Sequence, residues 1–377
     1  MAEVDGQPYA LLEDLPPNVV AARAMLAEDA RWSVDLIQSS AESPLQGLIG
    51  LTFARHFVRV IHEGRAMLAS HERPSGWLDI AAHLGSAHPE VESRVRNALK
   101  LVDDTSKHME GVLAGLTRTL DHHRDSLRRR ARPSWIRPLA TDLGVSRVNG
   151  TAVLATVPAG FLLGLDDPDV AEMHGVSIET LTFEWGGNLL WLAVALEPKM
   201  PTLGSLGLGN IRIDTSDYHA DTYLRKRFGD GLSTGLGLLL LGVEAEAGVV
   251  SALGPLVCEG HAGTAFRLRV ITAFHTAGAL RAISEHPGTT HLVRQELLPV
   301  LTAEYTLRIL SRGGVLVRHR CVHYLANDPT VEFDFARPMF GIVESVFPGQ
   351  TFEQHNRDIE DFFGDVERLM REVWPSP

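Results

Sequence analysis

The sequence predicts a mainly α-helical protein of several domains, with a small β-containing region in the middle of the chain. Over most of the first 140 or so and the last 115 or so residues, apolar side chains recur every three or four positions, the spacing of a helix with one buried face. Runs of β-branched and aromatic residues, bounded by Gly and Pro, occur instead between about residues 148 and 214. We therefore divide the chain into a helical domain (1–145), a mixed α/β middle region (146–260) and a C-terminal helical bundle (261–377).

The N-terminal domain is predicted to contain two long helices, at 45–70 and 89–132, because both segments carry apolar residues at helical spacing. Loops are expected around residues 74–76 and at Pro133.

In the middle region we expect strands at 151–157, 177–185 and 188–196. The most apolar stretch, Leu232–Val243, is short for a bilayer span and is soon followed by Glu244 and Glu246. We interpret it as a buried core segment of a protein that does not cross a membrane.

The C-terminal region is predicted to be a compact bundle of four helices joined by short connections. The first helix, 264–286, stops at Pro287; the second, 291–311, is interrupted at Pro299 and ended by Gly313 and Gly314 in the manner of a C-cap. A short helix, 315–326, follows and stops at residues 327–329. The last helix starts with a capping box formed by Thr351 and Gln354 and has one apolar stripe from Phe352 to Val373.

Composition limits the class of protein. The two cysteines, Cys258 and Cys321, are too few for a disulfide framework, and the acidic N-terminus has no apolar run after it, so we expect a cytoplasmic protein. A formal net charge of −12 argues against a protein that coats nucleic acid, because phosphate binding needs a positive field. Any site for RNA must then be local, and residues 305–326 offer one, with four arginines and no Asp or Glu.

Within that basic segment, Arg318 and His323 form the strongest candidate catalytic pair. Five arginines are followed by a His after four to six residues, but only Arg318 has a polar Asn, Asp or His directly after it, namely His319. An imidazole that titrates near neutrality can move protons, and a guanidinium can hold a phosphate with two parallel hydrogen bonds. The candidate catalytic residues are therefore Arg318 and His323, and the candidate substrate-binding residues are His319, Arg320, Arg312 and Tyr324.

In this segment the chain resembles the HEPN superfamily, helical domains of prokaryotic toxin, abortive-infection and RNA-processing proteins. The family pattern is an Arg, a polar residue, and a His four to six positions after the Arg, at the start of a helix in a small bundle; Arg318, His319 and His323 match it. The resemblance covers about 115 of the 377 residues, and the first 260 carry none.

The resemblance implies a metal-independent endoribonuclease or a toxin-type effector of antiviral defence. Its site would lie in a groove between two copies of the chain, because Arg318 and His323 do not share a face of an ideal helix. His323 would move a proton at the ribose 2′-hydroxyl or the leaving oxygen, and Arg318 would stabilise the phosphate charge. The implied partners are RNA, a second copy and a regulatory protein; no cofactor and no metal is expected.

Three alternatives stay open. The bundle could be a non-catalytic binding, immunity or scaffold protein, in which Arg318 and His323 only pair with acids. His319 and His323 have the i, i+4 spacing of zinc ligands, although no acid lies between them as in His-Glu-x-x-His, and His122–His123 is a weaker case. Arg55, with a His seven residues later, is a near miss to the family spacing on a helix that we interpret as structural.

Overall fold

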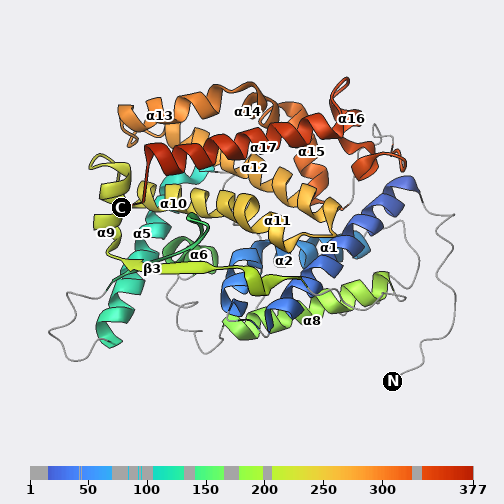
Figure 1. Cartoon of the computed structure of the whole chain (residues 1–377), viewed down its shortest axis with the longest axis horizontal. Coiled ribbons are helices and arrows are strands. Elements are labelled where there is room, and N and C mark those ends of the chain that lie inside the picture. The colour runs from blue at the N-terminus through green and yellow to red at the C-terminus, as the bar shows by residue number, and fades with distance from the viewer. Residues whose placement is uncertain are drawn as a thin grey trace.

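The protein is mainly helical, with one small antiparallel sheet in its middle region (Figure 1). The computed structural model describes residues 16–41, 43, 45–69, 84, 92, 95, 105–130, 141–164, 178–197, 206–324 and 333–376. The predicted loops at 74–76 and Pro133, residues 89–104 of the predicted helix 89–132 except 92 and 95, and the predicted stop at 327–329 lie outside these residues.

Helices from the first half of the chain form the lower part of the molecule in Figure 1. α1 and α2 pack against each other and against α8. The predicted helix 45–70 is confirmed as α2, and the part of 89–132 from Thr105 to Arg130 as α5; α1 has no counterpart among the predicted helices. The bounds are α1 Pro17–Ala41, α2 Gln46–Ala69, α5 Thr105–Arg130, α6 Thr156–Leu162 and α8 Ile178–Leu196.

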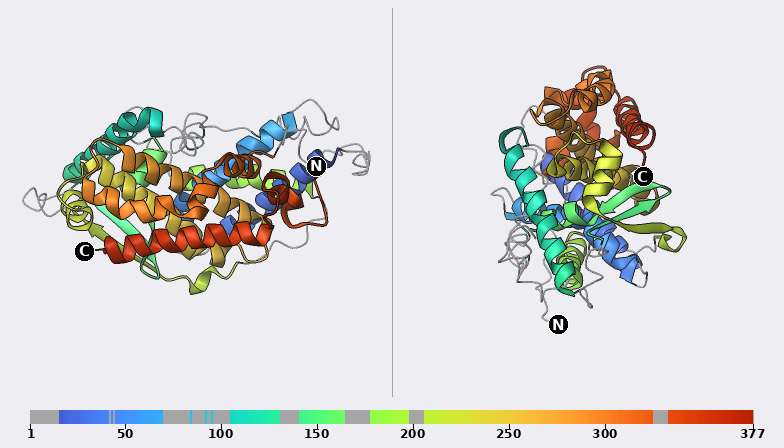
Figure 2. Two further views of the ribbon diagram at one scale, coloured as in Figure 1. Left: turned by 90° about the horizontal axis from the view of Figure 1, so that it is seen from above. Right: turned by 90° about the vertical axis from the view of Figure 1, so that its left-hand side faces the viewer.

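Helices from the second half form the upper part, with α12 in their centre in contact with α10, α13, α15 and α17. Seen from the end, these helices lie above α1 and α2, with the sheet on one side and α5 on the other (Figure 2). The bounds are α9 Ala220–Phe228, α10 Thr234–Gly248, α11 Gly254–Val257, α12 Ala262–Glu285, α13 His291–Thr302, α14 Glu304–Ile309, α15 Arg312–Val322, α16 Ile342–Val346 and α17 Phe352–Arg368.

The sheet contains three antiparallel strands in the order β2-β1-β3, namely β1 Leu143–Val148, β2 Thr151–Ala155 and β3 Ile213–Tyr218. β1 and β2 form a hairpin whose turn residues, Asn149 and Gly150, both have positive φ angles, of 51° and 82°. Asn-Gly is the preferred pair for such a turn, because it tolerates the left-handed conformation. The predicted strand at 151–157 is thus confirmed as β2, shortened at its end by α6.

The predicted strands at 177–185 and 188–196 are wrong: the described part of this segment is one helix, α8. Its buried side chains, Leu181, Trp185, Leu189, Leu192 and Leu196, are spaced by three and four residues, which is the helical period. They face α1 and α2, so packing of this face outweighs the strand preference of the aromatic and Thr residues.

The predicted buried segment is confirmed as the main part of α10, which continues through a π turn, Val249–Leu253, into α11. The span Thr234–Val257 is long and apolar enough to cross a membrane, and 72% of its apolar window is buried inside the protein. At Gly248 an added Cβ would lie 1.9 Å from the carbonyl oxygen of Ala152, so this glycine lets the helix lie directly on β2. Location in the cytoplasm stays a prediction.

Two helix boundaries in the C-terminal region differ from the prediction. The segment 291–311 is interrupted at Ala303, whose backbone is extended, and not at Pro299, which lies on the exposed side of α13. Water can satisfy the carbonyl that Pro299 leaves without a donor there. Gly313 and Gly314 do not cap the preceding helix; they form the first turn of α15, and the hydroxyl of Ser311 accepts the amide of Gly314 at 3.2 Å.

Two further C-terminal predictions agree with the structure. The helix at 264–286 is α12, and the last helix, α17, starts with the capping box of Thr351 and Gln354. α17 continues as a π turn, Leu369–Val373. Among the described residues, one cluster of buried hydrophobic side chains runs from Val19 to Trp374. The division into three domains stays a prediction.

Candidate functional site

Arg318, His319 and His323 lie at the C-terminal end of α15, and not at the start of a helix as in the family pattern. The predicted helix 315–326 is therefore shifted toward the N-terminus. His323 has left the helix, with extended backbone angles of φ −102° and ψ 128°, and its amide donates to the carbonyl of His319 at 2.9 Å. The angular separation expected on an ideal helix consequently does not apply to His323.

The structure brings a carboxylate of α2 to this helix end. Nδ1 of His323 lies 2.6 Å from Oε2 of Glu63, and the ring centroids of His319 and His323 are 4.5 Å apart. The carboxylate orients the imidazole and leaves Nε2 as the ring nitrogen that can exchange a proton with another molecule. We call Glu63, Arg318, His319 and His323 the histidine cluster.

The guanidinium of Arg318 lies over the ring of Phe274, 5.3 Å from its centroid, in a half-buried position. Burial lowers the pKa of Arg318, and the carboxylate of Glu63 opposes that shift. For His319, burial is the main cause of a lowered pKa, and the neighbouring His323 and Arg318 add to it. At neutral pH the ring of His319 is therefore neutral and can accept a proton.

The other predicted substrate-binding residues do not join the cluster. Arg320 is 4% exposed and donates to the hydroxyl of Ser345 at 3.0 Å, and Tyr324 is 1% exposed. Arg312 is exposed but occupies the first position of α15, six residues before Arg318, which is about 9 Å along the helix axis.

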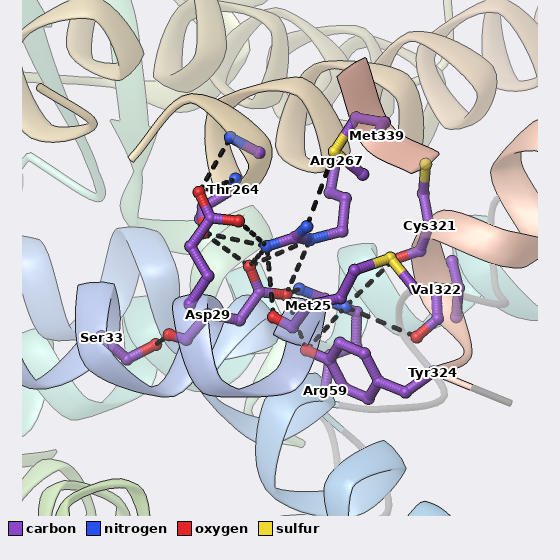
Figure 3. A network of polar contacts seen from close by, with 12 residues as sticks. Met25, Asp29, Ser33, Arg59, Thr264, Arg267, Cys321, Val322, Tyr324 and Met339 are labelled. Carbon is purple, nitrogen blue, oxygen red and sulfur yellow. Dashed lines mark hydrogen bonds and ion pairs between the residues drawn. The ribbon is translucent and has the colours of Figure 1, made fainter. Parts of the chain in front are cut away.

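Behind the cluster lies a buried polar network centred on Asp29 of α1, a residue that the sequence analysis missed (Figure 3). Asp29 is 0% exposed and accepts hydrogen bonds from Arg59 at 2.7 Å, from the Tyr324 hydroxyl at 2.6 Å and from Arg267 of α12. Thr264 also donates to it, at 2.7 Å. We call this set the Asp29 network.

Electrostatics keeps the centre of this network charged. Burial alone would raise the pKa of Asp29, but the guanidinium groups of Arg267 and Arg59 together hold it well below the usual range. Two arginines beside one carboxylate leave an excess positive charge, which Glu28 reduces at 3.1 Å from Arg267. The network thus joins α1, α2 and α12 to the segment that follows α15.

The Asp29 network also fixes the position of His323. Arg59 donates to the carbonyls of Cys321 and Val322, at 3.1 and 3.4 Å, which are the last carbonyls of α15. A cation is favoured there, because the end of a helix carries partial negative charge. Arg59 and Glu63 are four residues apart and therefore lie on the same face of α2. From this face Arg59 binds the backbone just before His323, and Glu63 binds the His323 side chain.

The sequence offers one signal for this arrangement. α2 carries Arg59 and Glu63 at i, i+4 spacing among the apolar residues Val58, Val60 and Ile61, and charges on a buried face need partners. Which partners they find depends on the tertiary structure, because Asp29 and the end of α15 are far away in the sequence.

Arg55 of α2 is buried and pairs with Glu246 at 2.5 Å, in agreement with a structural helix. Burial lowers the pKa of the neighbouring His56, with the charges of Arg55 and Arg59 adding to the shift. Within the described part of the chain, no group of three His, Cys, Asp or Glu side chains is arranged to hold a metal ion.

Comparison of the chain with protein-family models, with curated proteins and with solved structures finds no match. The HEPN resemblance therefore stays a prediction, and a function for this protein has to be argued from the histidine cluster itself.

Proposed function

We propose that this protein cleaves RNA without a metal ion, using the histidine cluster. The observation that carries the proposal is the contact of Glu63 with Nδ1 of His323 beside the ring of His319. Two imidazoles and a guanidinium at one place are the groups needed for proton transfer at a phosphodiester.

The proposed roles follow from the surroundings of each ring. His319, neutral because of its lowered pKa, takes the proton of the ribose 2′-hydroxyl as the 2′-oxygen bonds to phosphorus. His323, oriented by Glu63, donates a proton from Nε2 to the 5′-oxygen as the P–O5′ bond breaks. The products are a 2′,3′-cyclic phosphate and a free 5′-hydroxyl. Arg318 stabilises the negative charge on the phosphate oxygens.

The test is cleavage of labelled tRNA and mRNA in the presence of EDTA. We expect His323→Ala and His319→Ala each to lower the rate by about 100-fold or more, since a positioned proton-transfer group contributes at least that much. Arg318→Lys should not restore what Arg318→Ala loses, because lysine lacks the planar fork of the guanidinium. The matched control is His291→Ala, which removes an exposed imidazole on α13. Circular dichroism checks that each variant is folded.

Binding without catalysis is the second candidate function, and one observation favours it. Arg318 is half-buried over Phe274, while Arg320 and Tyr324 make internal contacts, so these polar groups also stabilise the end of α15. If the wild-type protein binds labelled RNA but does not cleave it, RNA binding without catalysis replaces RNA cleavage as the proposed function. Equal cleavage by wild type and His323→Ala would overturn the proposed mechanism.

A further inference from the structure

A pocket separate from the histidine cluster lies between α2, α5, α6, β2 and α10, and its walls are mainly apolar. Its empty space is about 760 Å³, a volume that includes the opening to solvent. The side chains that line it include Leu51, Val112, Val153, Phe161, Leu239 and Val249. We call it the apolar pocket.

One polar group in this wall lacks the partner that its position calls for. Thr52 lines the pocket, is 5% exposed, and its hydroxyl makes no hydrogen bond within the described part of the chain. A helical threonine ordinarily donates to the carbonyl four residues earlier, as Thr117 and Thr119 do on α5, at 2.9 and 3.0 Å. A buried hydroxyl without a partner is unfavourable, so a molecule in the pocket that forms a hydrogen bond with Thr52 would remove this cost.

The charged groups of the pocket already neutralise each other. Arg55 and Glu246 both line it and form an ion pair at 2.5 Å, with side chains 10% and 16% exposed. Arg55 lies one helical turn after Thr52, so the pair and the hydroxyl are on the same side of α2. A ligand carboxylate would compete with Glu246, and a ligand cation would compete with Arg55; an uncharged polar group avoids both costs.

We propose that the apolar pocket binds an uncharged small molecule with an apolar body and one hydroxyl, carbonyl or amide group. The body fills the space between α5, α6 and α10, and the polar group forms a hydrogen bond with the hydroxyl of Thr52. This inference is independent of the proposed RNA cleavage, because no residue of the histidine cluster lines the pocket.

The experiment uses the full chain and three probes with the same ten-carbon body: 1-decanol, decanoate and decyltrimethylammonium. Each probe competes with the uncharged dye N-phenyl-1-naphthylamine, whose fluorescence rises in apolar surroundings. We expect saturable dye binding and displacement by 1-decanol at concentrations at least about tenfold below those of the two charged probes, because only the charged heads disturb the Arg55–Glu246 pair.

Two pairs of variants locate the binding. Ala159 lines the pocket from α6, so Ala159→Leu should abolish binding of 1-decanol, while Ala336→Leu, at an exposed position outside the pocket, should leave it unchanged. Thr52→Val keeps the shape of the side chain but removes its hydroxyl. It should weaken 1-decanol binding about 3- to 10-fold, which is the effect expected from the loss of one hydrogen bond. Thr52→Ser should retain binding.

Thermal unfolding without ligand separates a binding role of Thr52 from a structural one. Because its hydroxyl has no partner in the described structure, Thr52→Val should melt no lower than wild type. The proposal is overturned if the dye does not bind saturably, if Ala159→Leu binds 1-decanol as wild type does, or if Thr52→Val binds it equally well. RNA cleavage by these variants stays at the wild-type rate in every case where they fold.

Discussion

At the scale of single residues, Asp29 is the side chain on which most of the surrounding polar contacts depend. Its carboxylate accepts hydrogen bonds from Arg59, Arg267, Thr264 and Tyr324, and none of these partners is close to it in the sequence. A buried charge is tolerated only when it is paired and hydrogen-bonded, and this set meets both conditions.

We therefore expect Asp29→Asn to lower the free energy of unfolding by about 3–5 kcal/mol, since it removes the carboxylate paired with Arg59 and leaves Arg267 with Glu28 as its remaining carboxylate partner. Urea titration followed by circular dichroism measures the change. Asp230→Asn, at an aspartate whose side chain is 88% exposed, is the control and should shift the midpoint little. A loss below about 1 kcal/mol in the Asp29 variant would mean that the network does not support the fold.

A second residue makes the stability depend on pH. His355 of α17 is buried between the rings of Phe347 and Phe266, and burial lowers its pKa to about 4, with Asp358 opposing and Arg308 adding to the shift. Below pH 6.5 the unfolded chain gains a proton at this ring that the folded chain does not take up until about pH 4. The folded state is therefore destabilised as the pH falls through this window.

At about 1.4 kcal/mol per pH unit, the loss from His355 approaches about 3 kcal/mol at pH 4. We expect the difference in unfolding free energy between pH 7 and pH 4.5 to shrink in His355→Gln, which cannot take up the proton. His291→Gln, at an exposed histidine, should keep the wild-type pH dependence. The same slope in wild type and His355→Gln would show that other groups set the acid limit.

At the scale of elements, the close approach of α14 and α15 positions the histidine cluster. The chain turns from Ile309 into Arg312 so tightly that a Cβ on Gly314 would lie 1.9 Å from the carbonyl oxygen of Ile309. Only glycine fits there. The first turn of α15, and through it the register of the helix that ends at His323, follows from this contact.

Gly314→Ala should destabilise the protein by about 1–3 kcal/mol, because the added methyl group forces α14 and α15 apart. The matched control is Gly111→Ala, on the exposed side of α5 with no atom within 4 Å of the new Cβ. It should stabilise the protein by about 0.5–1 kcal/mol, the usual gain from removing a glycine inside a helix. Thermal or urea unfolding of both variants measures the contrast, and equal effects of the two would contradict the steric argument.

At the scale of the whole molecule, α2 contributes side chains to both proposed sites, the apolar pocket and the histidine cluster. In the first half of α2, Thr52 and Arg55 line the apolar pocket. In its second half, Arg59 and Glu63 form hydrogen bonds with the end of α15 and with His323. The four side chains of the histidine cluster come from a single chain, so a site shared between two copies is not needed to bring Arg318 near His323. The homodimer, the regulatory protein partner and the cytoplasmic location remain predictions.

Local sequence pattern is enough to predict the fold class and the elements α2, α12, α17 with its capping box, and β2. Asn149-Gly150 is also a typical hairpin turn pair. In α8 the buried residues have helical spacing, but their aromatic and Thr neighbours are typical of strands. Arg318, His319 and His323 can be proposed as site residues from the sequence because their spacing lies within one short segment, and their role stays a prediction. The contact of Glu63 with His323, the Asp29 network and the apolar pocket can be seen only in the tertiary structure. Each of them brings together side chains that are far apart in the sequence. The energetic effect of a buried charge or an unpartnered hydroxyl depends on its neighbours, and packing of the whole chain determines which neighbours it has.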